Sequence, residues 1–525
     1  MKKKYVSMLM LIVCMTVSGC TANTAENKST INNSSDGATE IQKETSTKVD
    51  LPEEMASEVE SSQTTEEKQY TWQEITITLP DNWIGNCIIE ENESGFSIYQ
   101  KASYEKDNGM GYICGFYREK EYLNYGSGET LIAYTDAGDF YYFIQPTDFP
   151  CDTENEEVCT EYVEMCDMME NVKSSININA SGVKYDAQEY VLPSGSICGL
   201  TKEVLADMSD NQLWIAKNEI YARHGRRFQN EYLQNYFNRC SWYEGTVEPE
   251  QFDEAVLSQL ERDNLKTLVA AEQTYDEKHP YPKEYATTDT IEVDLMGNGN
   301  LNQVSYQVND DGNDNYSCQI TVDGTVYDLS DEDIYMISPI ADVFYITDIS
   351  EYDAGLEIAV LDEGPSCDPV THFFRYDGIL NYCGTVSGFP FPEQNGGVNG
   401  FNGNGGIYGR VRMDLVGTTY LQGYWWCDRV GNHISYQDTG YNEFIPAGGH
   451  ELYMDLPVYY EMSETSKTSV IPAQKEVFFM ASDMEEWVLV KGKDGNKGYV
   501  HILDGKVTEL GLPVEEVFSD LNYFD

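Results

Sequence analysis

The chain has 525 residues, of which 90 are acidic and only 33 are basic, and its formal net charge is −57 at pH 7. This charge argues strongly against binding to nucleic acid, whose phosphates need Lys and Arg, and it disfavours electrostatic docking onto anionic lipid. The 41% hydrophobic content allows packed cores, and the length allows about three to four domains. An acidic, tyrosine-rich surface suits solubility, cation attraction, or contact with polymers that are not strongly acidic, and colloidal repulsion explains it equally well.

The first twenty residues have the three zones of a secretory signal. Lys2 to Lys4 give a positive start, and residues 8–17 are almost wholly apolar. The apolar stretch is much shorter than the roughly 20 residues that span a bilayer. The ending Val17-Ser18-Gly19-Cys20 resembles the lipobox of bacterial lipoproteins. That resemblance implies cleavage after residues 1–19 and a diacylglycerol on the sulfur of Cys20, and the alternative is an ordinary signal peptide that happens to contain a cysteine.

Residues 20–68 are rich in Ser, Thr, Asn and Glu, and their few large apolar residues follow no period. Such a segment cannot bury enough apolar surface to offset the entropy lost on ordering. The composition therefore predicts a disordered tether. Together with lipid on Cys20, it predicts a protein anchored to the extracellular face of the cell membrane that does not cross it.

Residues 69–176 are predicted to form an α+β domain. The alternating segment Trp72–Leu79 predicts a strand that ends at the turn signal Pro80-Asp81-Asn82. Residues 157–172 have their apolar side chains roughly on one face and predict a helix.

The sequence does not decide whether the cysteines form disulfides. Of the 13 cysteines, one lies in the signal and Cys20 would carry lipid, which leaves an odd number with no CxxC pair and no spacing that suggests zinc. Cys151, Cys159 and Cys166 lie close together in the sequence, and one disulfide among them is compatible with export.

Residues 198–272 carry the most specific motif in the chain. Ser209 followed by Gln212 predicts a capping box at a helix start, and Gly225 is placed to end that helix in a left-handed conformation. The letters Tyr221-Ala222-Arg223-His224-Gly225 resemble the YARHG domain, a small helical extracellular module of bacteria. The resemblance implies association with the cell envelope, and no established catalytic activity comes with it.

Arg223 and His224 allow two interpretations. One is an anion or glycan site beside Glu219 and Asn218, and the other is a polar network in which Arg223 pairs with Glu219 or Glu261. The network is favoured, because buried charges need such partners.

Residues 281–388 return to strand patterns. The segment Asp294–Asn302 resembles the calcium loops of integrin-like propeller repeats, where carboxylates recur at alternate positions. Here only Asp294 keeps a carboxylate and Met296 occupies a ligand position, so a Gly/Asn turn is favoured. Too few blades are visible for a full propeller, which favours a partial or sandwich-like β domain.

A second acidic loop in this region is richer in oxygen ligands. Calcium binding and a solvated acidic loop are the two interpretations, and calcium is the only cofactor that the sequence suggests. The candidate ligands are Asp348, Ser350, Asp353 and Glu357.

The last part of the chain, residues 410–510, is predicted as a β region after an exposed, flexible Gly/Asn-rich loop at 390–409. Trp487-Val-Leu-Val490, the Asp494-Gly495 turn and Gly498-Tyr499-Val500 resemble the last strands of a bacterial SH3 barrel, placed at about 450–506. Such modules often bind peptidoglycan or peptides. Trp487 and Tyr499 would line a ligand groove, or pack in the core instead.

The expected fold is thus multidomain α+β: an N-terminal α+β domain, a small all-α YARHG-like domain, and an all-β region ending in an SH3-like barrel. The sequence has no GxSxG elbow, HExxH helix or phosphate-binding glycine loop, so no catalytic residues are assigned. The leading hypothesis is a non-catalytic protein that binds or scaffolds cell wall, peptidoglycan or an envelope partner. A cell-wall hydrolase with a divergent site and a calcium-responsive surface adhesin are the alternatives.

Overall fold

The structure is a computed structural model that describes residues 68–523, except 108, 121, 123–128, 148–149, 153–154, 186–188, 311, 313–315, 330–333, 335, 366–367, 429–432 and 467. The predicted signal, Cys20 and nearly all of the predicted tether lie outside the described residues. The chain divides into two compact units, the first ending at Lys184 and the second running from Tyr185 onward. No helix in the described part is long and apolar enough to cross a membrane.

The first unit is an α+β domain, as predicted. Its main sheet has the strand order β3-β4-β5-β7-β6-β9, and a smaller sheet has the order β1-β2-β8. The strands are β1 (Gln69–Trp72), β2 (Ile75–Thr78), β3 (Cys87–Glu91), β4 (Gly95–Gln100), β5 (Tyr112–Glu119), β6 (Glu129–Thr135), β7 (Phe140–Ile144), β8 (Asn177–Ile178) and β9 (Val183–Tyr185). The helices are α1 (Lys101–Lys106), α2 (Glu156–Cys166) and α3 (Met169–Ser174).

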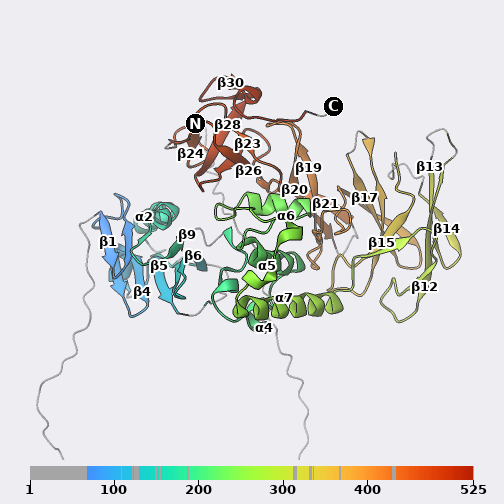
Figure 1. Ribbon diagram of the computed structural model, residues 1–525, viewed down its shortest axis with the longest axis horizontal. Helices are drawn as coiled ribbons and strands as arrows, with labels where there is room; N and C mark the ends of the chain where they lie inside the picture. Colours follow the sequence, from blue (N-terminus) through green and yellow to red (C-terminus); the bar gives the residue numbers. More distant parts are fainter. Residues whose placement is uncertain are drawn as a thin grey trace, which may run out of the picture. The chain divides into compact units, whose positions relative to one another are not determined.

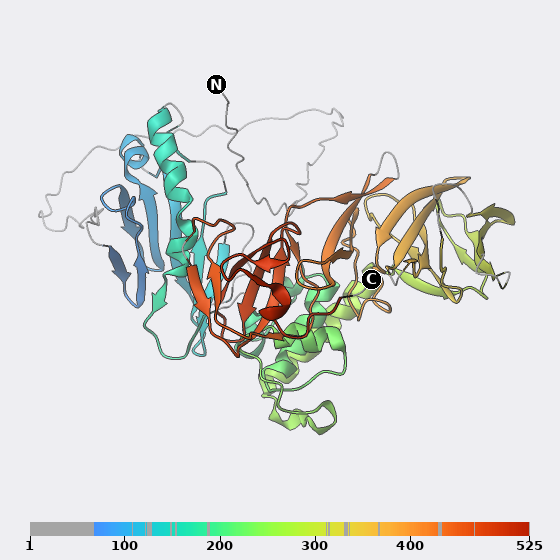
Figure 2. The same ribbon diagram turned by 90° about the horizontal axis from the view of Figure 1, so that it is seen from above.

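Helix α2 lies along the main sheet (Figure 2) and supplies Tyr162 and Met165 to the core. Tyr162 donates a hydrogen bond to the carbonyl oxygen of Tyr112 at 2.7 Å, which fixes the helix on the strand. The prediction of one helix over residues 157–172 is wrong in that the structure has two helices there. The backbone leaves helical geometry at Met168 (φ −95°, ψ 1°), so α2 and α3 are separate helices.

The second unit begins with a helical region around the YARHG motif. The helix starts follow from capping boxes: Ser209 with Gln212, as predicted, and Ser258 with Glu261. In each box the serine oxygen accepts the backbone N–H three residues on, and the Gln or Glu side chain accepts the serine N–H. The helices are η2 (Pro193–Ser196), α4 (Lys202–Leu205), α5 (Asp210–Ala222), α6 (Glu231–Asn238), η3 (Pro249–Gln251), η4 (Glu254–Val256) and α7 (Gln259–Lys278).

Three antiparallel sheets follow and pack face to face (Figure 1). The middle sheet is buried on both faces: along β16, Ile358 and Val360 enter one core, and Ala359 and Leu361 enter the other. The first sheet is β11 (Ile291–Val293), β12 (Asn302–Asp310), β13 (Tyr316–Val322) and β14 (Thr325–Asp328). The middle sheet is β10 (Lys283–Ala286), β15 (Val343–Thr347), β16 (Glu357–Asp362), β17 (Val370–Tyr376) and β18 (Leu380–Ser387), and the third is β19 (Gly406–Met413), β20 (Thr419–Asp428) and β21 (His433–Gln437).

The Gly/Asn-rich segment between β18 and β19 differs from the prediction of an exposed loop. Phe391 is buried and stacks on Tyr345 with ring centroids 3.7 Å apart. The side-chain amide of Asn211, in α5, donates to the carbonyl oxygen of Asn399 at 2.7 Å. Aromatic burial and these amide bonds make the segment a bridge between the helical region and the stacked sheets.

The C-terminal sheet has the strand order β22-β26-β27-β28-β24-β25, and in the described residues its two end strands do not pair with each other. The predicted closure into an SH3-like barrel is therefore not seen. The link between β24 and β28 is a single residue pair, Tyr459 with Tyr499, which is too little to continue a ladder. The strands are β22 (Asn442–Glu443), β23 (His450–Glu451), β24 (Leu456–Tyr459), β25 (Thr468–Ile471), β26 (Glu476–Ser482), β27 (Trp487–Gly492), β28 (Lys497–Leu503), β29 (Lys506–Val507) and β30 (Leu512–Pro513), followed by η6 (Val514–Glu516).

Two lysines of the C-terminal sheet hold the carboxyl end of α6. Lys491 Nζ donates to the carbonyl oxygen of Arg239 at 3.0 Å, and Lys493 Nζ donates to those of Asn238 and Cys240, each at 2.8 Å. The last carbonyls of a helix lack intrahelical partners and carry partial negative charge, so ammonium groups there are favourable. Lys491 also pairs with Glu189, which joins the start of the helical region to the same point.

We expect Lys491→Met to destabilise the second unit by about 3 kcal/mol. The substitution removes the buried cation that pairs with Glu189 and donates to the carbonyl oxygen of Arg239. Thermal unfolding followed by tryptophan fluorescence measures the change. Lys497→Met is the matched control, because Lys497 faces Lys491 across β27 and β28 but is exposed. Equal shifts for the two variants would contradict the assigned role.

In the first unit, we expect Cys151 and Cys159 to form a disulfide under oxidising conditions. Their sulfur atoms are 2.7 Å apart, so a bond at about 2.05 Å needs only a sub-ångström shift. Burial and the neighbouring Cys159 raise the pKa of the free Cys151 thiol to about 12, so little thiolate is present and the bridge should form slowly by thiol–disulfide exchange.

The Cys151–Cys159 bridge should stabilise the first unit by roughly 2–3 kcal/mol. Peptide mapping of protein purified under oxidising conditions without reductant tests it, with Cys166→Ala as the control that leaves the linked peptide intact. Alkylation of both thiols in that sample would show that the bridge does not form.

Candidate binding site

The five YARHG residues end helix α5 and start a polar network. Arg223 donates to Glu219 at 2.6 Å and to the carbonyl oxygen of Leu192 at 3.0 Å. His224 Nε2 lies 2.9 Å from a carboxylate oxygen of Glu261. Gly225 has φ +75° and leaves no room for a Cβ, which would lie 2.6 Å from a Thr246 oxygen, so glycine is required there. The favoured network interpretation of Arg223 and His224 agrees with this geometry.

This network fastens the segment before the motif onto the helices. Glu219 is fully buried, and burial raises its pKa although Arg223 opposes the shift. Its second oxygen accepts the N–H of Val191 at 2.6 Å. Asn264 in α7 donates to the carbonyl oxygens of Gly195 and Cys198, each at 2.8 Å. The motif therefore builds the domain, with its charges satisfied internally.

The loop before β12 forms the turn that the sequence favours. The carboxylate of Asp294 accepts the backbone N–H groups of Asn298 at 3.1 Å and Gly299 at 2.6 Å. Gly297 has φ +62°, and a Cβ there would lie 2.0 Å from the Ala354 carbonyl oxygen. The single retained carboxylate thus serves backbone N–H groups.

Arg375 lies among the carboxylates of the second acidic loop. It forms an ion pair with Asp353, and its Nη1 atom lies 3.3 Å from a carboxyl oxygen of Glu357. The other candidate calcium ligands are partly or fully buried, and neither Ser350 Oγ nor Asp348 Oδ1 has a hydrogen-bond partner. In the described part of the chain, no group of three or more His, Cys, Asp or Glu side chains is placed to hold a metal ion. Calcium remains a prediction, and Arg375 supplies the positive charge found at this loop.

Trp487 and Tyr499 share one face of the C-terminal sheet, and both are half-buried. Trp487 pairs with His501 and Leu489 pairs with Tyr499 across β27 and β28, so the four side chains point the same way. The opposite face enters the core through Val488, Val490, Val500 and Ile502. The outward side of the sheet is named here the aromatic face, with the members Tyr459, Trp487, Tyr499 and His501.

The aromatic face is rigid and rimmed by acids. The Trp487 ring stacks on the buried His501 ring with centroids 4.4 Å apart, and Tyr459 meets it edge-on at 5.4 Å. His501 Nδ1 lies 3.1 Å from Glu464, and Nε2 lies 3.2 Å from Glu486. These contacts hold the indole in place beside two carboxylates.

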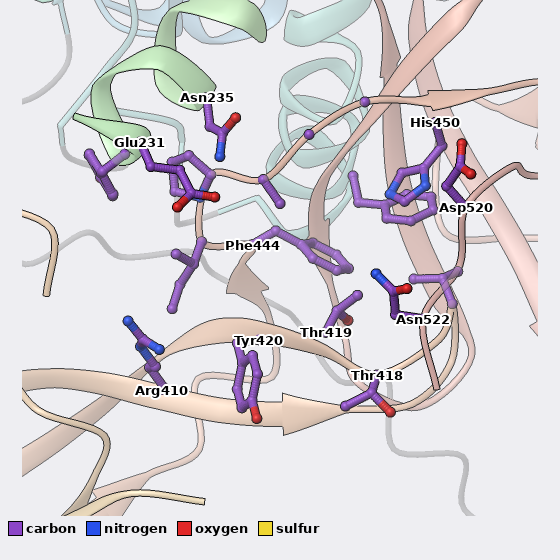
Figure 3. Close-up of a pocket in the computed structure, with 18 of the residues that line it drawn as sticks. Glu231, Asn235, Arg410, Thr418, Thr419, Tyr420, Phe444, His450, Asp520 and Asn522 are labelled. Atoms are coloured by element: carbon purple, nitrogen blue, oxygen red, sulfur yellow. The ribbon is translucent and has the colours of Figure 1, made fainter. Parts of the chain in front are cut away.

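A cavity of about 640 Å³ lies where α6, β20, the segment 444–450 and residues 520–522 meet (Figure 3). Its walls are tied together by backbone bonds: Thr418 N–H donates to Asn522 O at 2.6 Å, and Ile445 N–H donates to Tyr420 O at 3.1 Å. Arg239, at the end of α6, donates to the carbonyl oxygen of Phe444 at 3.0 Å. The volume is within the range of small-molecule sites. The side chains labelled in Figure 3 are Glu231, Asn235, Arg410, Thr418, Thr419, Tyr420, Phe444, His450, Asp520 and Asn522.

The lining combines apolar walls with a few polar groups. His450 Nδ1 lies 2.8 Å from the carbonyl oxygen of Ser519, which can only accept, so Nδ1 carries the hydrogen. The His450 ring also stacks on Phe479, with centroids 4.5 Å apart. This cavity could not be predicted from the sequence, because its residues form no motif and come from segments that are far apart in the chain.

The family model for the YARHG domain matches residues 188–273 of the chain. No curated protein and no solved structure matches. The chain therefore contains a YARHG domain, and it begins before the predicted start at residue 198. The earlier start has a structural reason, because the segment before residue 198 is hydrogen-bonded to the motif. Val191 donates its N–H to Glu219, and the carbonyl oxygen of Leu192 accepts from Arg223.

We expect Glu357→Gln to change the pH dependence of stability. Burial raises the pKa of Glu357 to about 8, with Asp353 and Asp348 acting in the same direction and the Ile349 N–H and Arg375 opposing. The side chain is therefore protonated in the folded state over a pH range where the unfolded chain ionises. Its contribution to stability is full at pH below about 4.5 and is lost as the pH rises to about 8.

The Gln variant lacks this titration, so its stability relative to the unmodified protein should rise steadily between pH 5 and 8. Unfolding midpoints measured across that range test it, with the exposed neighbour variant Glu363→Gln as control. A difference that does not change with pH would contradict the assignment.

Proposed function

We propose that this protein is a lipid-anchored extracellular protein of the bacterial cell envelope that binds the cell wall or an envelope partner without catalysing a reaction. The observation that carries the proposal is the aromatic face, where Trp487 and Tyr499 are half-buried and directed away from the core. A rigid aromatic ring with a polar rim offers a large contact area at little entropic cost.

The charges around the aromatic face select the class of partner. Glu464 and Glu486 flank His501, and Tyr459 is hydrogen-bonded to Glu509. Carboxylates at the rim repel polyanions and accept hydrogen bonds from hydroxyl, amide and ammonium groups. Neutral amino-sugar chains and amine-bearing peptides of peptidoglycan fit this surface better than acidic polymers do.

The resemblances to SH3-like modules, to propeller blades and to lipoproteins are part of the same proposal. The hairpin β27–β28, with Gly498 before Tyr499, supports a relationship to SH3-like modules even though the sheet stays open. Face-to-face packing of three antiparallel sheets supports a relationship to propeller blades. The YARHG domain supports placement at the envelope, and the sequence of residues 1–20 supports export and a lipid on Cys20.

The test is pelleting of residues 21–525, produced without lipid, with purified peptidoglycan. We expect the protein to co-sediment, and Trp487→Ala to reduce its affinity about 10-fold, as loss of a central aromatic anchor does. Trp487→Phe keeps an aromatic ring and should retain most of the binding.

Tyr453→Ala is the matched control, because Tyr453 is a 58% exposed aromatic residue of the same region with no ring contact to the aromatic face. Equal losses for the Trp487 and Tyr453 variants would remove the aromatic face from the proposal. Failure to bind either peptidoglycan or extracted envelope proteins would overturn the proposed function, and release of soluble wall fragments would favour a hydrolase.

A further inference from the structure

Arg410 is the one cation among the residues that line the cavity of Figure 3, apart from the ring of His450. It lies on β19 opposite Gln422, and its side chain rises from the strand along the edge of the cavity. Its Nε atom is fully buried and has no hydrogen-bond partner. No carboxylate of the described residues forms an ion pair with its guanidinium group, and burial lowers the pKa of Arg410.

The neighbouring arginine shows that the missing partner is not a general feature of this sheet. Arg412, two positions along the same face of β19, lies 3.8 Å from Asp368 and 3.3 Å from Asp414. The part-buried Arg223 and Arg375 each have carboxylate partners as well. In a chain with 90 acidic residues, a half-buried guanidinium group that forms no ion pair with a carboxylate is costly, and an external anion would offset that cost.

We propose that the cavity binds a small molecule through a single carboxylate group, with Arg410 as its partner. A guanidinium group presents two parallel N–H donors to a carboxylate. The lining residues include no lysine that would help to bind a doubly charged phosphate.

The other polar groups narrow the ligand class further. Glu231 from α6 and Asp520 from the C-terminal segment also line the cavity. In the view of Figure 3, Glu231 lies above Arg410 and Asp520 lies at the opposite side of the cavity. They repel further negative charge and would accept hydrogen bonds from an ammonium or hydroxyl group. Phe444 and Tyr420 supply apolar surface. The fitting ligands are a short peptide with a free carboxyl end and a sugar acid, which share the carboxylate.

The site joins three parts of the second unit, since α6, β19–β20 and the C-terminal segment all contribute to its lining. Bound carboxylate would therefore stabilise the contact between the YARHG domain and the sheets. The cavity is separate from the aromatic face. An experiment that rejects carboxylate binding in the cavity therefore does not reject wall binding by the aromatic face, and the two outcomes are distinguishable.

The test measures binding of four probes to residues 21–525 by ligand-observed NMR, together with thermal unfolding. The probes are alanyl-alanine, its C-terminal amide, glucuronic acid and inorganic phosphate. We expect binding of at least one of the two carboxylates, and Arg410→Met to weaken it about 10-fold or more. Without ligand, Arg410→Met should unfold at a higher temperature than the unmodified protein, because it removes a buried cation that has no partner.

Arg412→Met is the matched control, and it should leave carboxylate binding unchanged because its partners are Asp368 and Asp414. Binding of alanyl-alanine but not of its amide identifies a peptide carboxylate, and binding of glucuronic acid alone identifies a sugar acid. The proposal is overturned if neither carboxylate binds, if only phosphate binds, or if Arg410→Met binds as the unmodified protein does.

Discussion

The contact between two lysines and the carboxyl end of α6 sets the arrangement of the second unit. The last carbonyl groups of a helix have no partners within the helix. Here the ammonium groups of Lys491 and Lys493, which belong to the C-terminal sheet, donate hydrogen bonds to them. Because Lys491 also pairs with Glu189, one point joins the start of the YARHG domain, the end of α6 and the hairpin β27–β28. The cavity wall at Phe444 is tied to the same helix end through Arg239.

Because acidic residues far outnumber basic ones, each basic side chain is important for neutralising carboxylates in the fold. With 33 basic residues against 90 acidic ones, cations are scarce, and most of those that are buried hold the fold together: Arg223 within the YARHG domain, Arg375 among the carboxylates of the acidic loop, and Lys491 at the helix end. Their partners are buried or partly buried carboxylates, for which loss of the cation is costly. Arg410 differs because it is half-buried, with a fully buried Nε atom, and has no such partner among the described residues, and this difference distinguishes the cavity from the rest of the surface.

Two surfaces of the second unit are suited to different partners. The aromatic face presents rings beside carboxylates and suits an extended polymer that carries little negative charge. The cavity is lined by residues from several distant segments, and the proposed ligand is a small molecule with one negative group. The YARHG domain contributes α6 to the cavity and fixes the hairpin that carries the aromatic face, which gives this domain a structural role toward both.

Local patterns in the sequence were enough for several parts of the fold. The capping box at Ser209, the left-handed Gly225 and the turn around Asp294 each involve residues a few positions apart, so sequence spacing alone defines their geometry. For Arg223 the sequence left Glu219 and Glu261 open as partners, and the structure pairs it with Glu219. The alternation in β27 and β28 likewise predicted paired strands but left open which face would be buried.

Tertiary structure decided the rest, because it depends on residues that are far apart in the chain. Which face of β27 lies outward is decided by what packs on the other side, and the C-terminal sheet is open because its end strands β22 and β25 do not pair in the described residues. The Gly/Asn-rich segment looked exposed because its composition is that of a loop, yet Phe391 and Asn399 attach it to distant elements. The cavity and the missing partner of Arg410 have no signal in the sequence at all, since the lack of a carboxylate near a guanidinium group is defined only once every other segment is in place.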